Sequence, residues 1–230
     1  RALAHLTLQS KMTLSATAIL LLGGGLLILL LERDNPATLG GMSLFDQIQA
    51  ALFQSVTTRT AGFATVDQAA LTPATTALCL ILMFIGGSPV GTAGGVKTVT
   101  LAVLLASSVA TIRNRNEVTM FHRQISKPFL RKATAVVMTS FLIMFISTVL
   151  LAAVTPKADA LDILYETVSA TATVGLSRNL TSDLTEAGKL IVAATMYLGR
   201  IGPISLAVAF GVTKEKQNIV NNPTEPVSVG

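Results

Sequence analysis

Two long runs of uncharged residues constrain the fold of this chain more than any other feature. Residues 12–31 contain no charged side chain over 20 positions, and residues 133–154 contain none over 22. A helix needs about 20 apolar residues to cross the hydrocarbon core of a bilayer. Two further apolar blocks, residues 74–112 and 187–212, carry one cation each away from their ends. Because only 13% of the residues are charged, against about 25% in an average soluble domain, we predict an all-α polytopic membrane protein.

The charges between these blocks predict how the chain crosses the membrane. The segment 112–132 lies between the second and third blocks and has a strong excess of cations: Arg113, Arg115, Arg123, Lys127, Arg131 and Lys132 against Glu117 alone. Short loops rich in Lys and Arg stay on the cytoplasmic side, and an even number of crossings places both ends of the chain there too. Nine of the twelve acidic residues then fall on the opposite face. The net charge of +5 therefore needs no nucleic-acid partner.

An internal repeat divides the chain into two halves. A shift of 113 positions places "TAGF" (60–63) over "TVGL" (173–176), and Gly86 over Gly199. In each half a span is followed by a short amphipathic segment, a glycine-containing island and another span. Matching order at a fixed period indicates repeated structural units. The prediction is one pore repeat in residues 1–115 and a second in 116–230, the latter ending in a cytoplasmic tail.

The amphipathic segments 44–58 and 160–172 are too short to cross a bilayer. We expect each to be a helix that enters the membrane from the acidic face, with the chain returning through the island that follows. Non-helical backbone is tolerated at membrane depth only where protein surrounds it or water reaches it, and a pore meets both conditions. An ordinary outer loop with a surface helix remains an alternative.

The two islands have the composition of an ion-selectivity filter. Small residues allow backbone carbonyls to replace the hydration shell of an ion such as potassium, and glycine allows the required backbone angles. The candidate filter residues are Thr60, Ala61, Gly62 and Phe63 in the first half, and Thr173, Val174, Gly175 and Leu176 in the second.

A glycine-rich stretch interrupts the apolar block 74–112. Residues 86–95, "GGSPVGTAGG", hold five glycines and a proline, which strongly disfavour a continuous helix. The block is also too long for one crossing, so we expect a helix broken by a loop inside the membrane. A kink between closely packed helices is the alternative. A phosphate-binding loop is rejected, because Val96 separates Gly95 from Lys97 and the motif requires them adjacent.

Together these motifs resemble the membrane subunits of the Trk/Ktr/HKT potassium transporters, and the stretches 86–98 and 199–203 ("GRIGP") resemble the bacterial Ktr branch. Members of that family fold four span–pore helix–span repeats in one chain around a central pore. The resemblance implies that this chain is the third and fourth repeats of a potassium uptake protein of a bacterial plasma membrane. The N-terminal half would be missing.

The resemblance also implies partners and a gate. The partners would be a second copy in a homodimer, a nucleotide-binding regulatory ring on the cytoplasmic side, and membrane lipids at the basic loop. The gate would be the loop below the filter together with an arginine that obstructs the ion path: Gly86, Gly87, Ser88, Gly91, Gly94, Gly95 and Arg200.

Three cations near these motifs need an explanation, because ionisable groups inside a membrane are functional candidates. Arg200 is expected to contact loop carbonyls of residues 86–95. Lys97 either belongs to the same site or extends to the cytoplasmic surface. Arg59 directly precedes the first filter segment, where it either bonds to a neighbouring pore helix or lies at the outer mouth.

Other function classes fit less well. Ser88 as a protease nucleophile would need a base, but the two histidines, His5 and His122, lie in the cytoplasmic segments, and no acid lies within a span. We therefore do not expect this chain to be an enzyme. A sodium-coupled secondary cation transporter is the alternative, since broken helices also hold ion sites at mid-depth; its ions would include sodium besides potassium.

Overall fold

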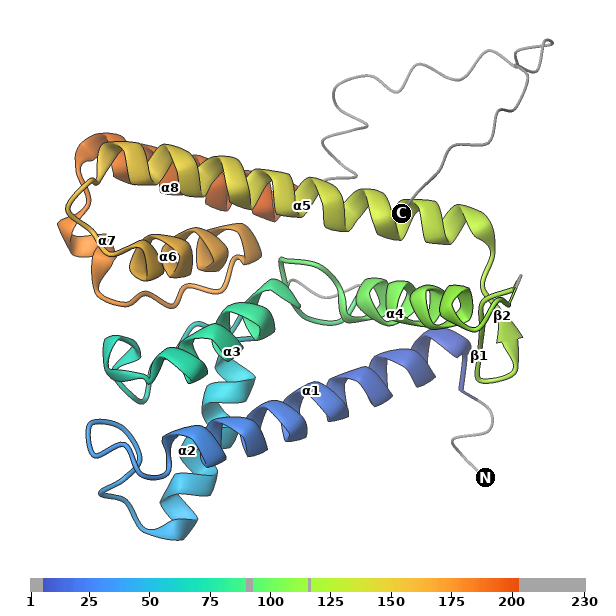
Figure 1. Ribbon diagram of the computed structural model, residues 1–230, viewed down its shortest axis with the longest axis horizontal. Helices are drawn as coiled ribbons and strands as arrows, with labels where there is room; N and C mark the ends of the chain where they lie inside the picture. The colour runs from blue at the N-terminus through green and yellow to red at the C-terminus, as the bar shows by residue number, and fades with distance from the viewer. Residues whose placement is uncertain (1–5, 90–92, 116, 203–230) are drawn as a thin grey trace.

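The computed structural model describes residues 6–89, 93–115 and 117–202, and these residues form a mostly helical protein (Figure 1). Its helices in chain order are α1 (Leu8–Glu32), α2 (Leu44–Thr57), α3 (Pro73–Phe84), α4 (Thr98–Ile112), α5 (Lys127–Val154), α6 (Ala160–Ala172), α7 (Leu180–Asp183) and α8 (Glu186–Ile201), with a 3₁₀ turn, η2 (Gln68–Ala70), before α3.

Helices α1 and α5 have the length and composition of membrane spans. They contain 25 and 28 residues, and their apolar windows have mean hydropathies of 2.5 and 2.4. Only 17% of each window is buried, whereas the core helix of a soluble protein would be mostly buried. Helices α3 and α4 are apolar but shorter, with 12 and 15 residues, because the glycine-rich stretch separates them.

Side-chain caps and prolines start several of these helices. The hydroxyl of Ser43 accepts from the Asp46 N–H ahead of α2, and the hydroxyl of Thr185 does the same for Gly188 ahead of α8. Pro73 begins α3, where its missing N–H is not needed. These residues satisfy donors that the first turn of a helix leaves unpaired.

Three consecutive glycines lie inside α1, and two of them explain how α2 packs. A Cβ at Gly24 would lie 2.6 Å from the Ser55 hydroxyl, and one at Gly25 would lie 2.7 Å from a methyl of Leu52. A side chain at either position would therefore push α2 away. Small residues allow such close helix contacts where lipid supplies no hydrophobic driving force.

Each half of the chain packs mainly on itself, and the halves meet through two helix pairs. Helix α1 contacts α2, α3 and α4, while α5 contacts α6 and α8. Contacts between α3 and α6 and between α4 and α5 join the halves. Figure 1 shows α5 and α8 running side by side, with α7 and the C-terminal end of α1 at one end of the molecule and the strands at the other.

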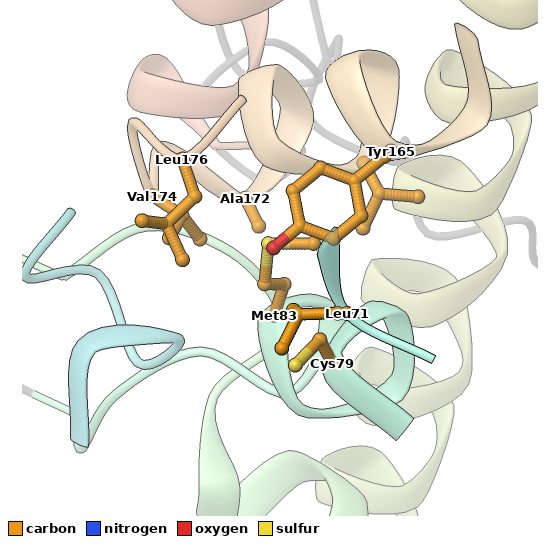
Figure 2. Close-up of a cluster of buried hydrophobic side chains, with 8 residues drawn as sticks. Leu71, Cys79, Met83, Tyr165, Ala172, Val174 and Leu176 are labelled. Atoms are coloured by element: carbon orange, nitrogen blue, oxygen red, sulfur yellow. The ribbon is translucent and has the colours of Figure 1, made fainter. Parts of the chain in front are cut away.

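The core at the junction of the halves is shown in Figure 2. Leu71, Cys79 and Met83 come from the first half; the second half contributes Tyr165, Val168, Ala172, Val174 and Leu176. Tyr165, Cys79 and Met83 have no exposed surface. The residues of the second predicted filter segment thus pack against α3 of the first half.

One element departs from the all-α prediction. Strands β1 (Thr119–Met120) and β2 (Arg123–Gln124) form a short antiparallel hairpin in the basic segment. Phe121 and His122 connect them with φ angles of 49° and 61°, and two central residues with positive φ make the turn that matches the twist of paired strands. Neither residue is a usual turn former, so no local pattern indicated the hairpin.

A buried carboxylate ties the end of α1 to the start of α3. Glu32 has no exposed surface. One of its oxygens accepts from Asn35 at 2.7 Å and from the Thr38 hydroxyl at 2.6 Å, and the other accepts from the N–H and hydroxyl of Thr72 at 2.8 and 2.6 Å. A buried charge is tolerated because four donors surround it.

Replacing Glu32 with glutamine should lower the melting temperature of the detergent-purified protein by several degrees. The amide nitrogen cannot accept, and hydrogen bonds to a charged group contribute about 1.5–3 kcal/mol. Glu186→Gln is the matched control, because that side chain is 91% exposed. Equal melting temperatures for Glu32→Gln and the unmodified protein would contradict this account of the carboxylate.

Candidate filter and gate

The two predicted filter segments lie side by side, each directly after a short helix. Residues 60–63 follow α2 and residues 173–176 follow α6. A Cβ on Gly62 would collide with the carbonyl oxygen of Val174, and a Cβ on Gly175 would lie 3.8 Å from the Cα of Gly62. The fold therefore brings together two stretches that are 113 residues apart in the sequence.

Both segments have the same unusual backbone. The φ angles are 70° at Thr60 and 77° at Gly62, and 55° at Thr173 and 95° at Gly175. Left-handed backbone is easy for glycine, but it is an outlier for a β-branched residue such as threonine. The same pattern at both repeat positions redirects the peptides of each segment in the same way.

Hydroxyl groups hold each segment to its own helix. The Thr57 hydroxyl donates to the carbonyl of Phe63 at 2.6 Å, and the Ser169 hydroxyl accepts from the N–H of Gly175 at 3.2 Å. Helices α2 and α6 end at these segments. The C-terminal end of a helix carries a partial negative charge, so both ends present a potential that favours cations beside the segments.

The glycine-rich stretch packs beneath the second segment. The N–H of Val96 donates to the carbonyl of Phe84 at 3.1 Å, which closes the break between α3 and α4. A Cβ at Gly94 would collide with the Thr173 side chain and lie 2.8 Å from the Ala172 carbonyl. Only a residue without a side chain therefore fits at Gly94.

The other predicted gate residues are only partly described. Gly86 and Gly87 are buried, and Ser88 and Gly95 are half-buried. A Cβ at Gly86 would collide with the carbonyl of Gly94, so the two ends of the stretch touch. Gly91 lies outside the described residues.

The two cations predicted inside the membrane line one cavity. Lys97 and Arg200 border a space of about 300 Å³ with Gly95 and Thr171, and they interact electrostatically. The Lys97 ammonium donates to the carbonyl of Ala93, so it bonds to the glycine-rich stretch. Arg200 is exposed near the end of α8. Lys97 thus bonds directly to the glycine-rich stretch, and Arg200 borders a cavity that Gly95 of the same stretch also lines.

Arg59 has a contact that the sequence did not indicate. Its Nη2 lies 3.5 Å from the carbonyl of Gly86, toward which it donates, so it contacts the glycine-rich stretch. The guanidinium is half-buried, and its Nε has no hydrogen-bond partner among the described residues. Arg59 is thus a link between the first segment and the stretch beneath it.

A set of polar residues around the segments was missed by the sequence predictions. Arg178 follows the second segment by two residues and is mostly buried; Gln54, Gln68 and Tyr165 are fully buried near it. The available signals were an arginine two residues after a filter candidate, and Gln54 and Gln68 among the five glutamines of the first half. Neither signal indicates a partner, because the partners lie on different elements.

Comparison with known proteins decides the family. Residues 6–222 match the TrkH family, described as cation transport protein. The chain belongs to the TrkH family. Membership confirms the resemblance to potassium transporters and agrees with the expectation that the chain is not an enzyme.

Relatives and a solved TrkH-family structure extend this finding. Ktr system potassium uptake protein B of Bacillus subtilis (strain 168) is 41% identical over 213 residues, which are 93% of this chain and 47% of that protein. Potassium/sodium uptake protein NtpJ of Enterococcus hirae is 35% identical over 229 residues, 98% of this chain and 51% of that protein. The chain thus spans about half the length of these relatives.

The solved structure supports the fold alone. The potassium transporter TrkH from Vibrio parahaemolyticus matches with a TM-score of 0.69 at 22% identity, over 86% of this chain and 44% of that one. The likeness confirms a helical membrane-transporter fold for the described residues.

Substituting alanine for Gly94 should reduce the amount of folded transporter, because the new methyl would collide with Thr173 and Ala172. Gly23→Ala is the matched control: nothing lies within 4 Å of its Cβ, and alanine favours a helix by about 1 kcal/mol. Size-exclusion chromatography of the tagged protein would compare them. Equal yields of monodisperse protein from the two variants would mean that the stretch does not pack against Thr173.

Proposed function

We propose that this chain is half of a potassium-conducting pore, formed by the third and fourth span–pore helix–span repeats of a TrkH-family transporter. One observation carries the proposal: Thr60 and Gly62 have left-handed backbone, and so do Thr173 and Gly175 at the matching repeat positions. Strained backbone at two equivalent, adjacent sites is typical of a functional constraint. The length of the relatives supports two further repeats in the N-terminal half of the transporter.

In this proposal the ion path runs between the segments 60–63 and 173–176. Their carbonyls replace the hydration shell of the ion, and the C-terminal ends of α2 and α6 lower its electrostatic energy. Two segments from the missing half would complete the ring. Potassium is the transported ion rather than a resident cofactor.

The glycine-rich stretch and the two cations form the proposed gate. The described residues of the stretch, 86–89 and 93–95, cross the path below the filter, where Gly94 packs beneath Thr173. The predicted gate residue Gly91 belongs to the same stretch but lies outside the described residues. Lys97 bonds to the stretch, and Arg200 borders the same cavity. Positive charges there repel a passing cation, most strongly where the local dielectric is low.

The same proposal assigns orientation and partners. The basic segment with the β1–β2 hairpin faces the cytoplasm of a bacterium together with both ends of the chain, in accordance with the excess of cations. Exposed Arg113 and Arg115 at that end suit anionic lipid headgroups. A homodimer and a nucleotide-binding regulatory ring are the further partners we propose from the family resemblance.

Sodium transport is a second candidate, favoured by the name of one relative, the potassium/sodium uptake protein of Enterococcus hirae. In that case the broken region between α3 and α4 would hold a coupling ion. Potassium uptake by the complete transporter would then depend on external sodium. Uptake that is independent of sodium would leave the uniport pore as the function.

Gly175→Ser in the complete transporter should lower the potassium-over-sodium preference by about tenfold, which corresponds to about 1.4 kcal/mol. There is space for a side chain, but a residue with φ near 95° is strained by it. Ion competition in cells that require potassium uptake would measure the preference. Gly41→Ser is the control, because nothing lies within 4 Å of that position. An unchanged preference with normal expression would refute the filter assignment.

Arg200→Ala should raise potassium flux per folded molecule several-fold and leave the ion preference nearly unchanged, because it removes positive charge from the path. A deletion within 88–95 should act in the same way. Combined, the two changes should be less than additive, since both remove one obstruction. Flux measured in proteoliposomes containing a known amount of protein would decide. A flux per molecule that falls or stays constant in both variants would exclude this gate.

A further inference from the structure

Arg178 joins three segments of the chain just outside the second filter segment. Its Nε forms an ion pair with Asp162 of α6 at 2.6 Å. Its Nη1 donates to the backbone carbonyl of Gln68 and to the hydroxyl of Thr76, each at 2.9 Å. Gln68 and Thr76 belong to the first half, whereas Arg178 and Asp162 belong to the second. The guanidinium therefore crosses the boundary between the halves.

The side chain of Gln68 continues this connection toward both short helices. Gln68 and Gln54 of α2 exchange two amide hydrogen bonds, of 2.6 and 3.2 Å. The Tyr165 hydroxyl of α6 donates to Gln68 at 2.9 Å. The three side chains are at most 2% exposed, so water does not compete for these bonds. Gln68 thus connects α2 with α6, the two helices that precede the filter segments.

Helix α6 also fixes the chain on both sides of Arg178. Glu166, one turn after Asp162, accepts from the hydroxyls of Ser177 and Thr181 at 2.7 and 2.6 Å. The residue pair Ser177 and Thr181 brackets Arg178 closely in sequence. A displacement of Arg178 would therefore move the outer end of the segment 173–176.

We propose that Arg178 is a positioning residue that sets the spacing between the two filter segments and thereby the preference for potassium over sodium. The inference rests on the proposed function. Arg178 does not contact the ion in this account: its charge is paired with Asp162, and its side chain is only 12% exposed. Its effect is geometric, since a guanidinium can hold three acceptors in a fixed plane.

The decisive comparison is Arg178→Lys against Arg33→Lys in the complete transporter. Lysine keeps the charge but cannot reproduce the planar arrangement of donors. Arg33, which directly follows α1, also pairs with an aspartate, but its side chain is 61% exposed. We expect Arg178→Lys to lower the potassium-over-sodium preference by about fivefold or more, because hydrogen bonds to charged groups are strong and directional. Arg33→Lys should leave the preference unchanged.

Thr76→Val provides a second, milder test in case Arg178→Lys folds poorly. It removes one acceptor of the guanidinium at nearly constant volume, at a site without exposed surface. The preference should fall in the same direction but less, and the double variant Arg178→Lys/Thr76→Val should be less than additive. A preference that is unchanged in folded Thr76→Val would overturn the inference.

Two readouts separate this role from simple structural support. A merely structural arginine predicts that potassium and sodium transport fall together, in step with the amount of folded protein; that result would overturn the inference. If Gly175→Ser alters the preference and folded Arg178→Lys does not, the filter assignment stands and the role of Arg178 is refuted. If neither alters it, the proposed function fails first.

Discussion

The backbone groups that leave a helix inside a membrane must find partners within the protein, because hydrocarbon offers none. Under the proposed function, three stretches leave their helices in that way, with described residues 58–67, 85–89 and 93–97, and 173–179. The structure meets the requirement by hydrogen-bonding each stretch to the helix that precedes it. Phe63 receives a bond from Thr57, Val96 donates to Phe84, and the N–H of Gly175 donates to Ser169.

Glycine makes the arrangement sterically feasible. Gly62 lies against the carbonyl of Val174, Gly94 beneath Thr173, and Gly199 against the carbonyl of Thr171. A backbone carbonyl or a neighbouring side chain lies against each of these glycines, which leaves no volume for a methyl group. Gly86 and Gly199, which occupy matching repeat positions, both have such contacts. A repeated steric demand therefore accounts for much of the repeated glycine pattern in the sequence.

Much of the fold and part of the site could be predicted because their signals are local. Uncharged runs indicated α1 and α5, and glycine with proline indicated the break between α3 and α4. The partners of Arg178 could not be predicted, since the Gln68 carbonyl lies 110 residues away and any residue supplies a carbonyl. The contact from Arg59 to Gly86 was missed for the same reason. Side-chain hydrogen bonds across helix boundaries depend on packing, which periodicity does not encode.

The left-handed threonines make the segments 60–63 and 173–176 dependent on their surroundings for their conformation. Thr60 and Thr173 have conformations that cost an L-residue roughly 1–2 kcal/mol each. Contacts with the surrounding protein therefore hold the segments in a conformation that their own backbone preferences disfavour. Under the proposed function, an ion that binds only to this conformation would stabilise it by mass action. Ion binding and the rigidity of the outer mouth would then be thermodynamically coupled. A pore without potassium would therefore have more flexible segments at 60–63 and 173–176.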